Sequence, residues 1–464
     1  MTTPAPGVGI FSFAGHTARL TRTLPYFWGS RYIFGRADSW ETTLAYGFAH
    51  LGKSLFWYTS ELLFAYFLTE FVGLSIHHMG AVLATGFLIG AAVDLVVGFG
   101  LERRLTTASS ASHIQFVGAI LCSASLIAVF LGASMPMEFR FGYALAAGIV
   151  FRLGFAAYDI PQNALMALAT VDTHGRMRIA STRIWFSGAA TLIVAFTVGP
   201  LIARRDQPEA VSFLLGLAVL FAIVAIGSAW LLLHLLRDQR PEARPGTVAA
   251  FPRVRLPADF WLLLLVMAAT SIFTPAFGKL EPYFATYALR SAWWGGVVVI
   301  LMAAGIVVGQ PVWLHLCTRM AGGLVMLLNA LLQIVALTAF WLIGPAHPIA
   351  SAVAAFMFGL GNGGVGMVQW AAFSETVTRL GPSRTGFSYG LFAAAGKLSL
   401  AVGSLLLAAV LAPIDFRGPD GADLIILMVA IPGVGALCCA LAGIGLFAIE
   451  RADKPTASVM QTKF

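Results

Sequence analysis

Long apolar runs separated by short polar breaks fill most of the chain from residue 46 onward. A helix needs about 20 mostly apolar residues to cross a bilayer, so each run predicts one membrane-spanning helix. The first six predicted spans are 46–72, 77–101, 113–134, 141–169, 183–203 and 210–236. Six more follow a polar break, at 258–288, 291–316, 320–344, 348–377, 385–412 and 423–449. The pattern therefore predicts an all-α membrane protein with twelve transmembrane helices.

The composition supports this prediction and excludes several classes of protein. Of 464 residues, 59% are hydrophobic and 11% are charged, and the mean hydropathy is +0.84. An average soluble protein has about 25% charged residues. The four cysteines all fall inside apolar runs, where we expect small buried side chains and no disulfide framework or metal cluster. Water-soluble enzymes, nucleic-acid binders and secreted disulfide scaffolds are excluded, and the bilayer is the expected environment.

The basic excess has a topological explanation. The chain carries 29 Lys and Arg against 21 Asp and Glu. With both termini placed in the cytoplasm, 20 of the 29 basic residues fall on the cytoplasmic side and 5 on the outer side. Cytoplasmic loops of membrane proteins are enriched in Lys and Arg. The distribution predicts an even number of spans with both ends inside.

Six spans, a basic linker and six further spans form the layout of a transporter in which two six-helix halves surround a central cavity, with sites near the middle of the bilayer. We expect a cytoplasmic extension at 1–45, a first bundle at 46–236, a cytoplasmic linker at 237–257, a second bundle at 258–449 and a cytoplasmic tail at 450–464. A respiratory subunit or an acyltransferase could share the helix count. The former would show paired haem histidines and the latter an acid–base motif, and neither occurs among the nine histidines.

Candidate functional residues are the charges that lie inside the apolar runs. A charge near the centre of a bilayer costs several kcal/mol unless it faces a partner or a water-filled cavity. The set comprises Lys53, Glu61, Glu70, Asp94, Arg152, Asp159, Lys279, Glu281 and Lys397. We expect the function to depend on members of this set.

Asp94 and Lys397 are the candidates for ion coupling. A carboxylate at Asp94 could bind Na⁺ through hard oxygen ligands, or could bind a proton. Lys397 lies about a dozen residues from either end of its span, too deep to reach an interface easily, and we expect it to balance Asp94 or Asp159 when the cation is absent. The alternatives are a structural Asp94 held by Arg103 and Arg104, and a snorkelling lysine.

The fourth span carries the candidates for solute binding. Arg152 and Asp159 are seven residues apart, which is two helical turns along one face, so both can point into the same cavity. Tyr158, Gln162 and Asn163 accompany them, a set of donors and acceptors that suits a polyhydroxylated solute. The alternative is an ion pair that only fixes the helix in register.

The first and seventh spans contribute further candidates. Trp57 or Tyr58 could stack on a sugar ring, the alternative being that these aromatics only pack or lie at the interface. Glu61 could accept solute hydroxyls or balance Lys53 or Arg152. For Lys279 and Glu281 we expect a locally paired, snorkelling set near the outer end of the seventh span.

Three stretches of the chain resemble the glycoside-pentoside-hexuronide:cation symporters, the branch of the major facilitator superfamily that contains the sodium/melibiose symporter. They are AYGFAHLGKSLFWYTSELLFAYFLTEFVGLS, YDIPQNALMALATVDTHGRMRIASTRIWF and FSETVTRLGPSRTGFSYGLFAAAGKLSLAVG. The resemblance implies that Asp94 is the second acidic position of the helix-two cation site and Asp159 the fourth-helix carboxylate that binds sugar. It further implies that Lys397 is the eleventh-helix lysine and Arg183 the arginine that opens helix five.

The chain departs from the family pattern at two acidic positions. The first-helix acid is replaced by Ser54, which weakens the case for a galactoside, and the other helix-two acid is replaced by Gly90. The loss at Gly90 removes a cation ligand, so proton coupling is favoured over sodium coupling, and Glu61 could compensate.

These observations predict a non-enzymatic, monomeric secondary transporter with no cofactor, coupled to H⁺ or Na⁺ and carrying a small polar solute such as a sugar or glycoside. Because no GxxxxGK[ST] phosphate loop is present, an ion gradient must supply the energy. We place the protein in the cytoplasmic membrane if its source is a bacterium. Two alternatives stay open: transport of an amphiphile such as a lysolipid or drug, and a non-transporting assembly or delivery factor on the same fold.

Overall fold

The computed structural model describes residues 39–100, 107–169, 173–207, 209–237, 256–343, 347–380, 385–417 and 422–452. Most of residues 1–45 and of the linker 237–257, and the end of the tail 450–464, lie outside these ranges. The described elements are helical throughout. Eleven of the helical segments are long and apolar enough to cross a membrane. The pair α1 and α2, which continue one another through Leu63, takes the place of the first predicted span, so that twelve crossing segments result.

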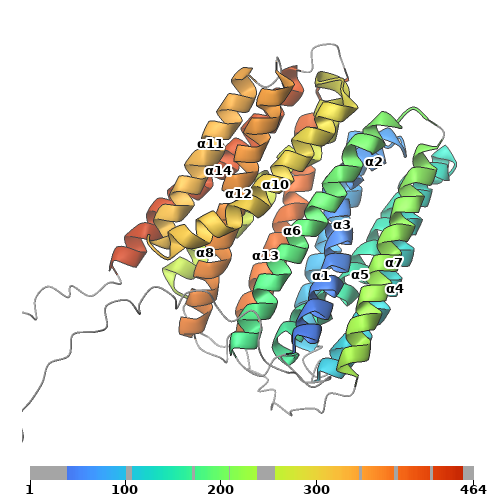
Figure 1. Cartoon of the computed structure of the whole chain (residues 1–464). Coiled ribbons are helices and arrows are strands. Elements are labelled where there is room, and N and C mark those ends of the chain that lie inside the picture. Colours follow the sequence, from blue (N-terminus) through green and yellow to red (C-terminus); the bar gives the residue numbers. More distant parts are fainter. Residues whose placement is uncertain are drawn as a thin grey trace, which may run out of the picture.

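The first half of the chain forms α1 (Trp40–Leu62), α2 (Phe64–Glu70), α3 (Ile76–Gly100), α4 (Ala108–Leu131), α5 (Arg140–Leu168), α6 (Thr173–Ala203) and α7 (Ala210–Leu236). The second half forms α8 (Ala258–Phe273), α9 (Pro275–Tyr283), α10 (Ala292–Cys317), α11 (Gly322–Ile343), α12 (Pro348–Leu380), α13 (Thr385–Leu411) and α14 (Ala422–Ala452). In Figure 1 the blue-to-green helices gather on one side and the yellow-to-red helices on the other. Contact between these two groups runs mainly through α3 with α13 and α6 with α10.

Capping side chains move helix starts ahead of the predicted spans. Ser39 accepts a hydrogen bond from the Thr42 amide, so α1 begins six residues before the predicted start at 46. Thr107 caps α4 in the same way, with a reciprocal bond to Ser110. A cap satisfies backbone amides that a helix end leaves unpaired, and apolarity plays no part in it. Hydropathy therefore underestimates the length of these helices.

The seventh predicted span, 258–288, is not one continuous helix. It divides at Thr274 into α8 and α9 and ends in a π-helical turn, Phe284–Ala288. Pro275 and Pro282 lack the amide that an α-helix needs, which explains the interruptions. The first span is likewise interrupted, at Leu63. Interrupted helices at corresponding positions of the two halves are a structural pointer to a transporter's binding region.

Glycines allow several helices to approach closely. A Cβ atom on Gly52 of α1 would lie 2.7 Å from the Ala225 Cα atom of α7. A Cβ atom on Gly199 of α6 would lie 3.2 Å from the Gly296 Cα atom of α10, on the other half. Small residues at such crossings are characteristic of membrane helices, whose association depends on close packing.

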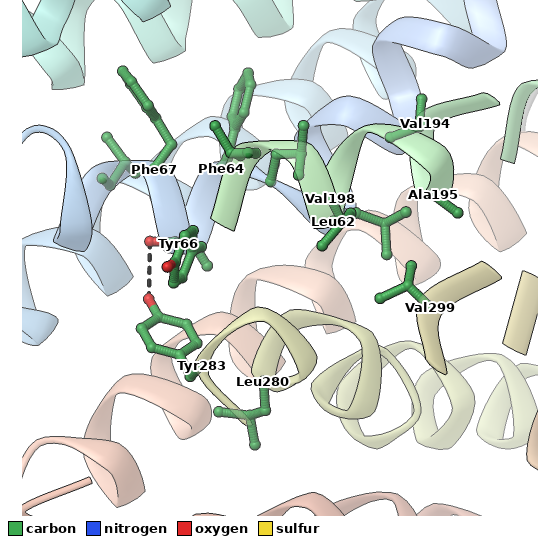
Figure 2. Close-up of a cluster of buried hydrophobic side chains, with 14 of the residues drawn as sticks. Leu62, Phe64, Tyr66, Phe67, Val194, Ala195, Val198, Leu280, Tyr283 and Val299 are labelled. Carbon is green, nitrogen blue, oxygen red and sulfur yellow. Dashed lines mark hydrogen bonds between the residues drawn. The ribbon is translucent and has the colours of Figure 1, made fainter. Parts of the chain in front are cut away.

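Large apolar side chains also cover the outside of the bundle. Ile223 is 65% exposed and Leu441 is 70% exposed, on helices from opposite halves. In a soluble protein such surfaces would favour aggregation, whereas lipid chains solvate them. A second apolar set is buried where the halves meet. In Figure 2, Tyr66 of the first half lies beside Tyr283 of α9, with 5.2 Å between the ring centres, whereas Phe64 and Phe67 point away from α9.

Candidate functional site

One pair of buried charges joins α1 to α5, both in the first half of the chain. Lys53 Nζ lies 2.6 Å from Asp159 Oδ1, and the Asn163 side-chain amide donates to the same oxygen at 3.1 Å. Lys53 is 6% exposed and Asp159 19%. The positive charge of Arg183 on α6 acts on both groups. The structure thus gives Asp159 a lysine partner, and Arg152 does not pair with it.

A second pair joins the two halves. Lys397 Nζ on α13 lies 2.7 Å from both carboxylate oxygens of Asp94 on α3. Lys397 passes Gly90, where a Cβ atom would lie 3.5 Å from its Cδ atom. The sequence proposed Lys397 as a counter-charge for Asp94 or Asp159, and the structure brings it to Asp94. Arg103 and Arg104, the alternative partners, lie outside the described residues.

Glu61 lies between two cations. Its Oε1 atom is 3.6 Å from Arg152 Nη2 on α5, and its Oε2 atom is 3.2 Å from Lys279 Nζ on α9. Glu61 comes two residues before the interruption at Leu63, and Lys279 follows the interruption at Thr274. The Glu61 cluster, defined as Glu61, Arg152 and Lys279, therefore spans both interrupted helices and both halves.

The expectation of a local Lys279 and Glu281 pair is wrong. Lys279 is 4% exposed and reaches across to Glu61, while Glu281 is fully buried. Two residues along an α-helix are about 200° apart, so these side chains leave α9 on nearly opposite faces. Neither lies at a surface, so snorkelling to the interface does not occur.

Aromatic rings cover the Glu61 cluster. The Arg152 guanidinium carbon lies 4.0 Å from the centre of the Phe87 ring, and Lys279 Nζ lies 5.3 Å from the same centre. Trp57 packs against Phe87 and contacts Phe155 at 5.5 Å between ring centres. The Arg152 side chain passes Gly86, where a Cβ atom would approach it to 3.1 Å. A cation over a ring face is stabilised by the ring quadrupole.

Two predicted solute-binding residues lie elsewhere. Tyr158 is fully buried and donates to the Ala49 carbonyl at 3.1 Å. Gln162 is also fully buried; it accepts a hydrogen bond from the Gln115 amide and donates to the Tyr46 carbonyl at 3.3 Å. Tyr158 thus links α5 to α1 and α7, and Gln162 links α5 to α1 and α4. In the structure, the hydrogen bonds of Tyr158 and Gln162 go to the backbone and to Gln115, and the structure places neither residue against Asp159.

A polar network joins the two halves at the end of the bundle that the charge distribution places outside, and Glu70 is its only member that the sequence indicated. Glu70 of α2 contacts Arg417, after α13, at 2.6 Å and Arg205, after α6, at 3.0 Å, and accepts a hydrogen bond from Tyr287. Glu70 is 2% exposed. Nearby, Thr69 Oγ1 lies 2.6 Å from the Tyr283 hydroxyl, which donates to the Ala65 carbonyl at 3.0 Å. We refer to Glu70, Arg205, Tyr287 and Arg417 as the Glu70 network. Only the contacts of these residues across the halves, which the sequence does not reveal, identify it.

In the described ranges, no group of three or more His, Cys, Asp or Glu residues is placed to hold a metal ion. The carboxylate of Asp94, the candidate Na⁺ ligand, is occupied by Lys397. A monovalent cation or a proton would compete with the lysine for these oxygens.

Comparison with known proteins gives a match over most of the chain. The model of a family described as MFS/sugar transport protein matches residues 45–450. An uncharacterized symporter, YjmB, of Bacillus subtilis (strain 168) is 22% identical over 36% of this chain, and a putative glycoside/cation symporter, YagG, of Escherichia coli (strain K12) is 23% identical over 34%. These alignments span only 37% and 35% of the relatives' own lengths.

A longer match is to the glucuronide carrier protein homolog of Escherichia coli (strain K12), 21% identical over 80% of this chain and 83% of the relative. Among solved structures, a D-xylose-proton symporter has a TM-score of 0.65 and 16% identity, covering 88% of this chain and 97% of that one. The structural likeness confirms the predicted fold class.

Proposed function

The chain belongs to the MFS/sugar transport protein family, and we propose that it is a cation-coupled secondary transporter of a sugar or glycoside. The membership confirms the resemblance found in the sequence and supports a multi-pass membrane protein that is not an enzyme. The observation that carries the proposal is the pair of buried ionic contacts, Asp94 with Lys397 and Glu61 with Lys279, that join the two halves. Buried charges in membrane helices mark substrate and ion pathways.

The Glu61 cluster is the proposed site for the solute. It holds two cations and one carboxylate, and both contacts are long, at 3.2 and 3.6 Å. A guanidinium has five donors in a fork that fits a carboxylate. Trp57 and Phe87 supply apolar faces for a sugar ring. These features favour a sugar that carries an acid group, in line with the name of the glucuronide carrier homolog.

Asp159 and Lys53 extend the proposed site inward. The Asp159 carboxylate and the Lys53 ammonium group are 2.6 Å apart. Each could give up its hydrogen bond to the other and bind a hydroxyl group of the solute instead. Asn163 stays with this pair because it already donates to Asp159. Arg183 contributes positive charge. Tyr158 and Gln162 have a packing role instead.

Asp94 and Lys397 form the proposed coupling site. When a cation or proton binds Asp94, it neutralises the carboxylate and releases Lys397, which weakens one ionic contact between the halves. We favour H⁺ over Na⁺ because Gly90 supplies no second carboxylate. The protein would act as a monomer in the cytoplasmic membrane of a bacterium, rocking residues 46–236 against 258–449.

Uptake into proteoliposomes tests the proposal. Purified protein is reconstituted, and accumulation of radiolabelled methyl β-D-glucuronide is measured under an imposed proton gradient, an imposed sodium gradient or neither. We expect accumulation under the proton gradient, and loss of accumulation in Asp94→Asn. Glu375→Gln, an exposed change on α12, is the matched control and should behave as the unmodified protein.

Failure would take an identifiable form. Uptake of lysolipid with no uptake of any glycoside or uronide would favour an amphiphile transporter. Absence of exchange with every solute, in protein that is folded, would contradict transport and favour an assembly or delivery factor.

A further inference from the structure

Glu281 is a buried carboxyl group that the proposed coupling site does not use. It lies on α9 and is fully buried, and neither of its oxygens has a hydrogen-bond partner among the described residues. Each of the other carboxylates inside the bundle has a cationic partner at 3.6 Å or less: Glu61, Asp94 and Asp159. Glu281 therefore differs from them in its environment.

An ionised carboxylate without a cationic partner has a high free energy in a buried, apolar environment. Transfer of an ionised carboxylate from water to a low-dielectric interior is so unfavourable that the group becomes neutral instead. The neutral acid is uncharged and costs far less to bury. Because no Lys, Arg or His side chain of the described residues forms an ion pair with Glu281, the species that neutralises it is a proton.

The charged and titratable side chains of the surrounding elements are engaged or distant. Glu61 is bound by Lys279, Glu70 by Arg205 and Arg417, Lys397 by Asp94, and Asp259 of α8 by Arg379. The remaining groups lie on the neighbouring helices α10 and α14. His315 and Cys317 are at the end of α10, and α14 carries Asp423, Cys438, Cys439, Glu450 and Arg451. On α9 itself, Lys279 and Tyr283 point to the first half of the chain.

The position of Glu281 connects it to the movement of the halves. Lys279 and Tyr283 are four residues apart and share one face of α9, and both contact the first half, at Glu61 and at the Ala65 carbonyl. Glu281 leaves the opposite face toward α10, where a Cβ atom on Gly295 would lie 3.7 Å from Glu281 Oε1. The next residue, Gly296, is the point at which α10 approaches Gly199 of the first half.

We propose that Glu281 is a second proton-binding site of the transporter, occupied in the conformation described here. The bound proton comes from water and forms one O–H bond with a carboxylate oxygen. When the contacts of α9 and α10 with the first half open, water reaches Glu281, the proton leaves and the carboxylate remains. The transport consequence rests on the proposed function; the presence of the proton does not.

Infrared spectroscopy tests the proton without any solute. Spectra of reconstituted protein at neutral pH should show the carbonyl stretch of a protonated carboxyl group, and the difference between unmodified protein and Glu281→Gln should contain that band. Glu281→Asp should keep the band at a shifted frequency. Glu375→Gln should leave the band unchanged, because Glu375 is exposed on α12 and is not part of the buried site on α9. Identical bands in Glu281→Gln and unmodified protein would overturn the proposal.

Transport of methyl β-D-glucuronide tests the consequence. Glu281→Gln keeps the neutral form, so exchange between equal solute concentrations should persist, while accumulation driven by a proton gradient should fall about tenfold or more. Undiminished proton-driven accumulation in this variant would overturn a coupling role. If the unmodified protein moves no sugar, the proposed function fails, and the infrared result still decides whether Glu281 holds a proton.

Discussion

The buried charges differ in how completely their partners satisfy them. Lys53 and Lys397 each hydrogen-bond a carboxylate, at 2.6 and 2.7 Å, whereas Glu61 meets its two cations only at 3.2 and 3.6 Å. Removal of one partner from a buried pair is costly because the other charge is left uncompensated. The short lysine–carboxylate pairs are therefore suited to a switch between a paired and an unpaired state. The longer contacts of the Glu61 cluster leave its charged groups able to bind a ligand.

Lys397→Ala should destabilise the protein by about 3 kcal/mol, because it leaves Asp94 buried without its cation. Thermal unfolding in detergent measures the effect. The double variant Lys397→Ala with Asp94→Asn should recover most of the loss, since no charge then remains unpaired. Equal losses in the single and double variants would show that the pair is not energetically coupled.

Gly90→Asp should create a sodium site. A Cβ atom at Gly90 would lie 4.0 Å from Lys397 Nζ, and the new carboxylate would join Asp94, one helical turn away. Sodium at a hundred times its dissociation constant should then stabilise the variant by about 2.7 kcal/mol. Unfolding in sodium chloride and in choline chloride measures the difference, and no sodium effect would contradict the site.

The sequence predicts these residues and narrows two of their partners: it pairs Lys397 with Asp94 or Asp159, and Glu61 with Lys53 or Arg152. Glu61, Asp94, Arg152, Asp159 and Lys397 could be identified because they are charged residues inside apolar runs. Charged residues are rare within a bilayer, whatever they contact. Pairing depends on helices far apart in sequence. Arg152 and Asp159 share α5, yet each binds a residue of α1. The depth of Lys397 in its span indicates a carboxylate partner, Asp94 or Asp159, and the structure shows that the partner is Asp94.

At the scale of helices, hydropathy located the crossing segments but not their interruptions. Apolarity is continuous through 258–288, whereas the division into α8, α9 and a π-helical turn follows from the prolines. The two interrupted segments, α1–α2 and α8–α9, carry Glu61 and Lys279. Hydropathy treats 258–288 as one continuous helix and does not show the break at Thr274. The prediction that Lys279 lies near the surface is based on that continuous helix, and it is wrong for this reason.

Gly52→Ala should weaken the packing of α1 on α7. The added methyl group would lie 2.7 Å from the Ala225 Cα atom, and backbone can move little, so we expect a loss of about 1–3 kcal/mol. Gly216→Ala on α7 is the matched control, because nothing lies within 4 Å of its added Cβ atom. Helix propensity should make the control neutral or up to about 1 kcal/mol more stable. Equal thermal stabilities of the two variants would contradict the close crossing.

For the whole molecule, the Glu70 network holds the predicted outer end closed. Glu70 is bound by Arg417 of the second half and by Arg205 of the first, so one carboxylate ties both. Glu70→Gln should weaken both contacts and shift the population toward an outward-open state. Reaction of a cysteine at Thr286, which contacts the Tyr66 hydroxyl at 2.7 Å, with a membrane-impermeant thiol reagent should then quicken roughly fivefold.

The labelling also tests the orientation predicted from the basic residues. Reagent added outside cells should reach the cysteine at Thr286 in the Glu70→Gln variant. Labelling only after the reagent is given access to the cytoplasm would reverse the assignment of the two faces. Glu138→Gln, an exposed change in the turn before α5, should leave the labelling rate unchanged.

The most direct test of cation-coupled transport is the simultaneous measurement of proton entry and sugar entry in one vesicle preparation. Vesicles that contain the protein and an internal pH-sensitive dye receive methyl β-D-glucuronide, and proton entry and sugar entry are recorded together. Coupled transport predicts proton entry that begins with the sugar, requires the sugar and is lost in Asp94→Asn. Sugar entry with no proton or sodium movement, or equal coupling in Asp94→Asn, would contradict it.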